Sequence, residues 1–193
     1  MQNNRHMSKT LDIMGCYVED YNSYFSGREL ARKLKLNPQT VLNHLQQLLK
    51  NNIIEKEIRG KSIFYSLNLS HLVTNILLKM TEDYRSYNAL DHFELNSILT
   101  KIAPFVDTII IFGSFASGKQ KESSDLDLVI IGSAKKDLVN KEKKVFARDI
   151  NIEYVSWTDF SKVFKNKNHL SVEIRKNHLI YGNTQKVVKI YSE

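Results

Sequence analysis

The sequence predicts a protein of mixed helices and strands, built from two dissimilar units. Residues 1–69 combine closely spaced amphipathic helices with two short β-rich runs. Residues 104–193 begin with short apolar strands that alternate with helical segments, a pattern typical of an α/β unit. Residues 70–103 carry apolar side chains at helical spacing, so we expect a helical linker there.

Composition and charge fit a folded protein of this kind. The chain has 193 residues, enough for one large domain or two small ones. It carries 28 Lys and Arg against 21 Asp and Glu, a formal net charge of +7 that suits a polyanion such as nucleic acid or a nucleotide. Cys16 is the single cysteine, which excludes an internal disulfide and a zinc site of several cysteines and predicts a cytoplasmic protein. The sequence shows no apolar leader and no run long enough to span a bilayer, so we expect no membrane partner.

The first unit carries start signals for three helices. Apolar residues at helical spacing predict a helix over residues 9–22, namely Leu11, Met14, Val18 and Tyr21. Ser26, with Glu29 three positions later, predicts the N-cap and capping box of a short second helix. Asn37 followed by Pro38 predicts the start of a third.

A hairpin follows the third helix. The β-rich runs Ile53–Ile58 and Ser62–Leu67 are joined by a basic turn, Arg59-Gly60-Lys61. The order helix, short helix, turn, helix and hairpin resembles the winged helix-turn-helix family of DNA-binding domains. Residues 26–34 (SGRELARKL) and 40–45 (TVLNHL), together with the hairpin, carry this resemblance.

The third helix and the hairpin tip hold the candidate DNA-binding residues. A helix presented by a tight turn fits the major groove, where neutral hydrogen-bonding side chains read base edges. Such side chains lie away from the leucine stripe of this helix, namely Gln39, Thr40, Asn43, His44, Gln46 and Gln47. Arg59 and Lys61 would contact phosphates or the minor groove. We expect double-stranded DNA as a partner; the alternative is a solvated helix face and a charged hairpin tip.

The linker predicts two helices, near residues 72–80 and 95–102, from its apolar spacing. Apolar faces on helices between domains either pack on a neighbouring domain or form a contact between two copies of the chain. A homodimer is therefore one of two expectations for this segment.

A two-part motif at the start of the second unit suggests phosphate chemistry. Gly113-Ser114 directly follows a buried strand, and Asp125 and Asp127 open the next one. Alternation along a strand places both carboxylates on the same face, where they repel each other unless a cation lies between them. Mg²⁺ is the expected cation, because it prefers oxygen ligands and is shared with substrate phosphates. Gly113 allows close backbone approach to a phosphate; a simple turn at a strand end is the alternative.

Gly113-Ser114, a loop containing Gly118, and Ser124-Asp125-Leu126-Asp127 resemble the signature of the minimal nucleotidyltransferases of the DNA polymerase β superfamily. The resemblance covers roughly residues 90–185 and implies a polymerase β-like α/β domain with a mixed sheet, so the expected fold class is α+β. It implies Mg²⁺-dependent transfer of a nucleoside monophosphate, AMP from ATP, to an unknown acceptor, with release of pyrophosphate.

The family pattern includes a third carboxylate on a later strand. The candidate strand is residues 149–155, where Asp149, Asn151 and Glu153 share one face. Glu153 best matches by position, and Asp149 is the alternative. We expect the metal and the chemistry on Asp125, Asp127 and Glu153, and the nucleotide on Gly113, Ser114 and Lys119.

Two further expectations come from the resemblance. Relatives of the family act as antitoxins that modify a partner toxin, so a toxin-like protein is one candidate acceptor. Glutamate in place of the family's third aspartate leaves an alternative open, a DNA-binding transcription regulator whose nucleotidyltransferase-like domain only binds a nucleotide.

Overall fold

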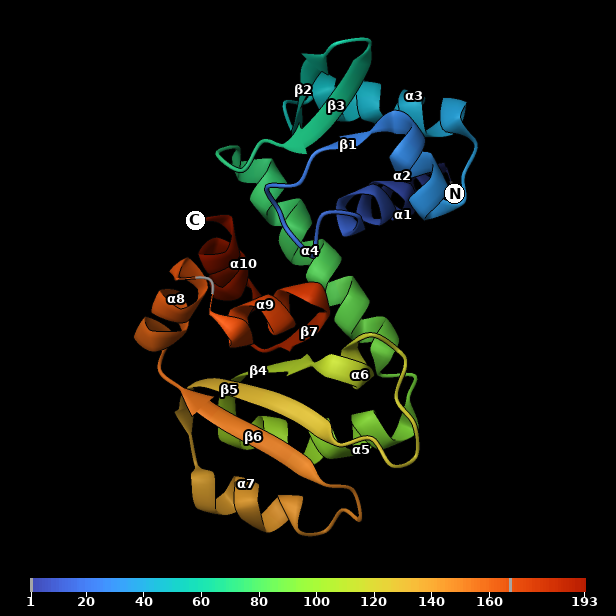
Figure 1. The fold of residues 1–193 in the computed structure, drawn as a ribbon. Coiled ribbons are helices and arrows are strands. Elements are labelled where there is room, and N and C mark those ends of the chain that lie inside the picture. The colour runs from blue at the N-terminus through green and yellow to red at the C-terminus, as the bar shows by residue number, and fades with distance from the viewer. Residues whose placement is uncertain (1, 167) are drawn as a thin grey trace. The chain divides into compact units, whose positions relative to one another are not determined.

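The computed structural model describes residues 2–166 and 168–193, with side-chain surroundings from residue 8 onward. The chain divides into two compact units, Met1–Thr81 with Ser192 and Glu82–Tyr191 with Glu193. The division falls inside helix α4 (Leu72–Ala89), in the segment predicted as a linker. Helices α4 and α5 (Phe93–Ile102) confirm the two helices expected there (Figure 1).

The first unit contains three whole helices, the first part of α4 and a small antiparallel sheet. Its helices are α1 (Gln2–Gly15), α2 (Gly27–Leu34) and α3 (Pro38–Lys50), and its strands, in the sheet order β1-β3-β2, are β1 (Phe25–Ser26), β3 (Ser62–Leu67) and β2 (Ile54–Arg59). Strands β2 and β3 form the predicted hairpin. The short strand β1 pairs with β3 and was not predicted, because two residues carry no periodic signal.

The predicted helix starts are confirmed. The Ser26 hydroxyl accepts a hydrogen bond from the Glu29 N–H (3.3 Å), and the Glu29 carboxylate accepts one from the Ser26 N–H (2.7 Å). The Asn37 side chain accepts a bond from the Gln39 N–H (2.8 Å), with Pro38 at the first helical position. These caps satisfy backbone donors that have no partner inside the helix.

The first helix ends earlier than the periodicity predicts. It stops at Gly15 and continues as tight turns, in which the Tyr17 N–H donates to the Met14 carbonyl (3.0 Å). A glycine costs about 1 kcal/mol relative to alanine inside a helix, which favours the break. Tyr17 and Tyr21 are nevertheless buried, so the spacing predicted their burial correctly and the helix end wrongly.

The second unit is built on a four-stranded mixed sheet in the order β6-β5-β4-β7. Its strands are β4 (Val106–Phe112), β5 (Leu126–Ala134), β6 (Ile150–Val155) and β7 (His178–Tyr181). Strands β5 and β6 are parallel and the other pairs antiparallel, which confirms the mixed sheet. Helices α5 and α7 (Lys136–Lys143) lie on one face, and α8 (Trp157–Lys165), α9 (His169–Lys176) and α10 (Thr184–Ser192) lie on the other (Figure 1).

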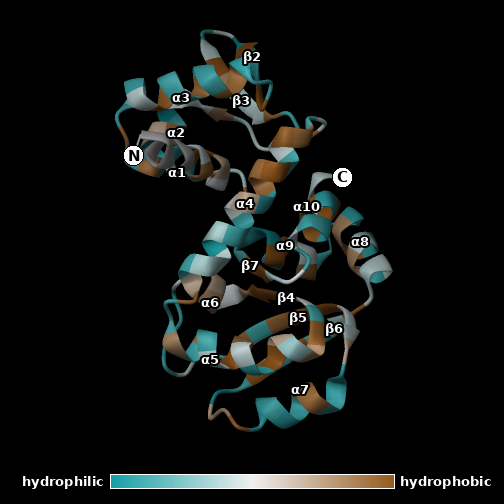
Figure 2. Ribbon diagram, turned by 180° about the vertical axis from the view of Figure 1, so that it is seen from behind, coloured by the Kyte–Doolittle hydropathy of each residue, from teal (hydrophilic) through white to brown (hydrophobic). Residues whose placement is uncertain are grey.

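The core between the sheet and α5 determines which way the carboxylates point. It contains alternate residues of the strands, helix residues and Phe115, among them Leu95, Ile98, Ile109, Ile111, Leu126, Leu128 and Leu179. Figure 2 shows the hydrophobic strands β4 and β5 within this unit. Because strand side chains alternate, Asp127 points to the opposite face, toward the side of α8, α9 and α10.

Helix α4 covers the free edge of β7. The Ser86 hydroxyl accepts a hydrogen bond from the Ile180 N–H, and the Tyr181 hydroxyl donates to the Ser86 carbonyl, both at 2.8 Å. The first bond satisfies a backbone donor at an edge where another strand could otherwise pair. In the described part of the chain, no helix has the length and apolar character needed to cross a membrane.

Candidate functional site

The side chains of Asp125, Asp127 and Asn151 meet at one edge of the sheet. Asp127 pairs with Phe112 of β4 on one side and with Asn151 of β6 on the other. The Asn151 amide nitrogen lies 3.0 Å from Asp127 Oδ1 and 3.4 Å from Asp125 Oδ2. Since one nitrogen reaches both carboxylates, the two aspartates converge on a common place.

Gly113 lies directly against this pair. It begins the short helix α6 (Gly113–Ala116) immediately after β4, with a φ of +72° that favours glycine. A Cβ at this position would lie 3.0 Å from Asp127 Oδ2. The Asp127 carboxylate therefore lies where a side chain of residue 113 would begin. The turn is closed by the Ser114 carbonyl, which accepts bonds from the Ser117 hydroxyl and the Lys119 N–H, each at 3.0 Å. Lys119 follows in the loop and is exposed.

The structure does not bring Glu153 to the aspartates. Glu153 pairs with Val129 of β5, two residues beyond the Asn151 pairing, which is about 6.6 Å at the rise of a strand. Among the described residues, no three His, Cys, Asp or Glu side chains, Asp149 included, are grouped so as to hold a metal. The assignment of Glu153 as the third carboxylate stays a prediction, and the side chain beside the pair is the neutral amide of Asn151. The register between β5 and β6 decides this, and a single strand pattern does not reveal it.

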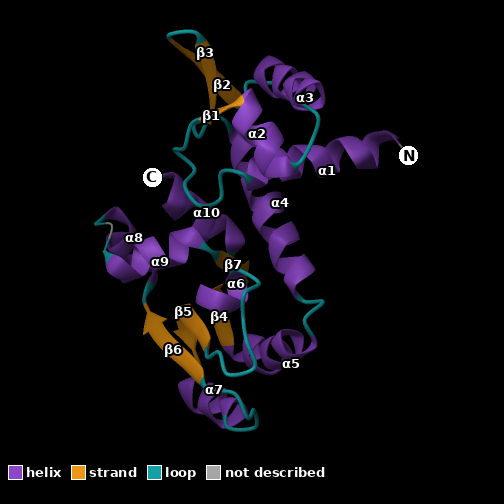
Figure 3. Cartoon of the chain, turned by 45° about the vertical axis from the view of Figure 1, so that its right-hand side comes forward, coloured by secondary structure: helices purple, strands orange, loops and turns teal. Residues whose placement is uncertain are grey.

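A partly buried arginine, Arg148, holds the loop that leads to Asp125. Arg148 donates two parallel hydrogen bonds to the Glu94 carboxylate, at 2.7 and 2.9 Å, and one to the Ser124 carbonyl. Its guanidinium carbon lies 5.0 Å from the centre of the Phe115 ring. The bond from Arg148 holds the pKa of the Glu94 carboxyl below its usual value. The loop between α6 and β5 is thus held in place next to a candidate metal ligand (Figure 3).

The Arg148 contacts could not be predicted from the sequence. Glu94 and Arg148 are 54 positions apart, on α5 and in the segment before β6. Neither belongs to a motif, and only the folded sheet brings them together.

The outer face of α3 has the polar character predicted for it. Val41, Leu45 and Leu48 are buried, whereas the predicted base-reading side chains are exposed or half-buried: Gln39, Asn43 and Gln47 are exposed, and Thr40 and His44 are half-buried. The Gln39 amide donates to Asn43 Oδ1 at 3.0 Å, which holds two of these amides in a fixed relation.

The two cationic side chains of the hairpin tip, Arg59 and Lys61, have different surroundings. The Arg59 guanidinium bonds the Glu57 carboxylate at 2.7 Å and lies over the Tyr24 ring, 4.4 Å from its centre. Its charge is therefore partly offset within the first unit. Lys61 is exposed beside Gly60, whose φ of +61° suits the tight turn.

Comparison with known families assigns the two domains that carry these residues. Residues 94–186 match the family described as polymerase beta, nucleotidyltransferase. This segment is a polymerase beta-type nucleotidyltransferase domain. Residues 16–55 match the family described as winged helix-turn-helix DNA-binding, so the chain joins a winged helix domain to the nucleotidyltransferase domain. A comparison with curated proteins gives no match.

The donor set of the nucleotidyltransferase domain fits one Mg²⁺. In proteins, Mg²⁺ is bound through one or two carboxylates and retains water and phosphate ligands, which is what Asp125 and Asp127 offer. The amide of Asn151 donates to both; a half-turn of that amide would present its oxygen at the same place. A second cation would need a further carboxylate, and the described residues supply none there.

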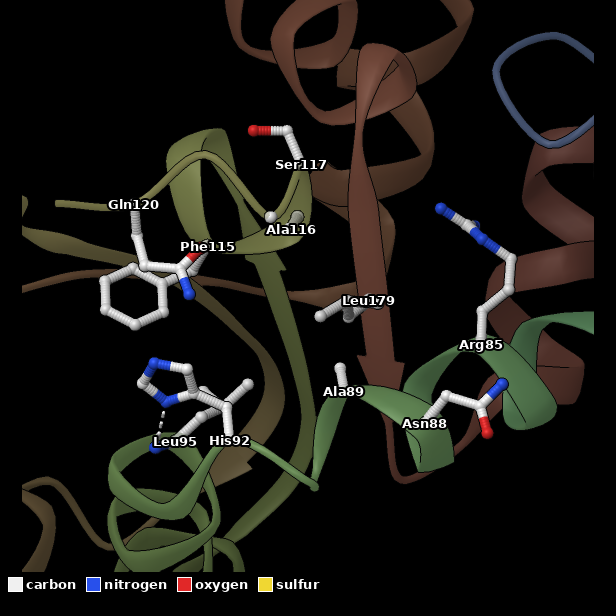
Figure 4. Close-up of a pocket in the computed structure, with 11 residues that line it drawn as sticks. Arg85, Asn88, Ala89, His92, Leu95, Phe115, Ala116, Ser117, Gln120 and Leu179 are labelled. Carbon is white, nitrogen blue, oxygen red and sulfur yellow. Dashed lines mark hydrogen bonds between the residues drawn. The ribbon is translucent and has the colours of Figure 1, made fainter.

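A separate cavity of about 440 Å³ lies in the same domain (Figure 4). It is lined by the end of α4, the start of α5, residues 115–118, Gln120 and Leu179. Leu95, Phe115 and Leu179 belong to the core on the α5 face, so the cavity opens on the face opposite Asp127. None of the site residues predicted from the sequence lines it.

Proposed function

We propose that the nucleotidyltransferase domain transfers a nucleoside monophosphate, AMP from ATP, to an acceptor hydroxyl. The observation that carries the proposal is the convergence of Asp125 and Asp127 beside Gly113. Two carboxylates beside a backbone without a side chain provide a place for a divalent cation and for the phosphates that share it.

Each residue has a distinct part in the proposal. Asp125 and Asp127 hold Mg²⁺, which supplies positive charge for the phosphate oxygens when it is bound. The backbone at Gly113, which carries no side chain, accommodates a phosphate at close range, and the Ser114 hydroxyl and the exposed Lys119 ammonium donate to the triphosphate. The acceptor oxygen bonds to the α-phosphorus, the bond from that phosphorus to the pyrophosphate oxygen breaks, and the hydroxyl proton passes to water.

The winged helix domain brings this chemistry to double-stranded DNA. In this proposal, the exposed amides of Gln39, Asn43 and Gln47 read base edges and Lys61 contacts a phosphate. The net charge of +7 supports binding to a polyanion. A toxin-like protein acceptor and a homodimer remain predictions from the sequence.

Pyrophosphate release from ATP tests the transfer step. We expect release that requires Mg²⁺ and falls about 100-fold or more in Asp127→Asn, a loss comparable to removal of one transition-state contact. Asp137→Asn, which removes an exposed carboxylate on α7, is the matched control and should retain release. Release at the wild-type rate in Asp127→Asn would contradict the proposal. Binding of Mg²⁺ and ATP without release, with water and with candidate acceptors, would favour the regulator that only binds a nucleotide.

A further inference from the structure

The cavity shown in Figure 4 is lined by an apolar wall and by several polar side chains. Its volume of about 440 Å³ lies in the range of small-molecule sites. The apolar wall is formed by side chains of the core and its margin, namely Ala89, Leu95, Phe115, Ala116 and Leu179. An apolar wall of this kind favours contact with the apolar face of a flat ring, because both surfaces are then removed from water.

The polar groups of the cavity are mainly donors. The Nδ1 atom of His92 accepts a hydrogen bond from the Leu95 N–H (3.4 Å), so in the neutral ring the proton is on Nε2 and that atom donates. Asn88 contributes an exposed amide. The Gln120 carboxamide oxygen is buried and has no hydrogen-bond partner among the described residues. A buried acceptor without a partner is costly, and a ligand N–H would satisfy it.

The charge of the lining is positive. Arg85 lines the cavity, and no aspartate or glutamate is among the lining residues. The Arg85 Nη1 atom donates to the buried Glu82 carboxylate at 2.8 Å, and its planar guanidinium carries further donors. These observations indicate a ligand with a flat heterocycle and an anionic group.

We propose that this cavity is a second ligand site, which binds a nucleoside monophosphate on the face of the sheet opposite Asp127. The base lies against Leu179 and Phe115, a ring N–H reaches Gln120, and the phosphate pairs with Arg85. The ligand is not the phosphoryl donor, because the sheet separates the cavity from the two aspartates.

The site is connected to the aspartates through one turn of chain. Gly113, at the start of α6, lies against Asp127, while Phe115 to Gly118, at its end, line the cavity. The bonds from Ser117 and Lys119 to the Ser114 carbonyl tie the two ends of the turn together. A ligand in the cavity therefore favours one arrangement of this turn, and binding at the two sites is coupled. This coupling rests on the proposed function, because it requires nucleotide binding at the two aspartates. Binding of a ligand to the cavity does not depend on the proposed function.

Calorimetric titration of the full chain with AMP, GMP, CMP and UMP tests the proposal. We expect at least one to bind, with affinity unchanged in Asp125→Asn/Asp127→Asn. Asn88→Asp adds a negative charge to an exposed lining position and should weaken binding at least tenfold, while Asn88→Gln, its matched control, should not. Ala89→Leu, which fills part of the cavity, should also weaken binding. Arg85 is unsuitable as a first target, because its loss would also remove one of the ion pairs of the buried Glu82 carboxylate, which also contacts His178.

Three outcomes would overturn the proposal: no binding of any monophosphate at millimolar concentration, binding that is lost in the double aspartate variant, or binding that neither Asn88→Asp nor Ala89→Leu alters. The coupling is measured as the change in Mn²⁺–ATP affinity at saturating monophosphate. A twofold or larger change supports it, and no change overturns it. If Mn²⁺–ATP fails to bind at all, the proposed function fails, and the monophosphate titration still decides the cavity.

Discussion

The amide nitrogen of Asn151 lies 3.0 Å from Asp127 Oδ1, beside the paired aspartates and in place of the predicted third acid. Its N–H₂ group bonds both carboxylates and so offsets part of their repulsion without a cation. A bound Mg²⁺ would have to displace these bonds. The pair therefore carries two negative charges, and Glu153 is not grouped with it among the described residues.

Asn151→Asp is expected to create a site of three carboxylates. Without metal, the added repulsion should destabilise the domain by about 1 kcal/mol or more. With Mn²⁺ and ATP, the extra charge should raise metal affinity at least tenfold and allow a second ion to bind. Electron paramagnetic resonance counts the bound Mn²⁺, and thermal unfolding with and without metal gives the stability.

Glu153→Gln is the control for that experiment. Because Glu153 pairs with Val129 and not with Asp127, its loss should leave Mn²⁺ binding unchanged. Two results together would contradict this account: weaker Mn²⁺ binding in Glu153→Gln and no gain of Mn²⁺ affinity in Asn151→Asp. They would show that Glu153, and not residue 151, occupies the place of the third metal ligand.

A comparison of Gly113→Ala with Gly118→Ala distinguishes the effect of backbone strain on nucleotide affinity from the effect of a new contact with Asp127. Both glycines have positive φ, +72° and +66°, so each substitution should cost roughly 1–2 kcal/mol of stability. Only at Gly113 would the new Cβ meet Asp127, 3.0 Å from Oδ2; nothing lies within 4 Å at Gly118. Gly113→Ala should therefore weaken Mg²⁺–ATP binding at least tenfold, and Gly118→Ala much less. Equal losses of affinity would show that strain alone matters.

The bond between Arg148 and Glu94 should stabilise the loop before Asp125. Arg148→Met and Glu94→Gln should each destabilise the domain, with a coupling of about 1 kcal/mol in a double-mutant cycle, because the pair is bidentate and partly buried. A coupling near zero would mean that the loop is held by other contacts.

This contribution should depend on pH in a defined direction. Folding lowers the pKa of the Glu94 carboxyl from its ordinary 4.5, because Arg148 bonds the charged form. The stabilisation is thus complete above about pH 4.5 and is lost as the pH falls through the lower folded value. Urea unfolding of wild type and Glu94→Gln should show a difference at pH 7 that shrinks below pH 4.5; a difference that grows in acid would contradict the assignment.

What the sequence could and could not predict follows from how each feature is encoded. The capping box at Ser26 and the Asn37-Pro38 start are local signals, and the structure contains both. Alternation likewise placed Asp125 and Asp127 on one face. Register between strands is not local, and the parallel pairing of β5 with β6 sets Asn151, not Glu153, opposite Asp127. Arg148 was missed for the same reason, since its partners come from distant segments.

The two cations of the hairpin tip should contribute unequally to DNA binding. Lys61 is exposed, so Lys61→Ala should weaken duplex binding and reduce the slope of log affinity against log salt by about one. Arg59 is paired with Glu57 and stacked on Tyr24, so Arg59→Gln should change the slope less. Fluorescence anisotropy over a salt series with random-sequence duplex gives both slopes. A larger slope change for Arg59→Gln than for Lys61→Ala would contradict this assignment.

Metal-dependent binding of nucleoside triphosphates tests the central claim most directly. Calorimetry with ATP, GTP, CTP and UTP, with and without Mg²⁺, should show one triphosphate, expected to be ATP, that binds wild type only with the metal. Binding should be lost in Asp125→Asn/Asp127→Asn and kept in Asp137→Asn. Absence of binding by any triphosphate, or equal binding by the double aspartate variant, would contradict a nucleotide site at Asp125 and Asp127.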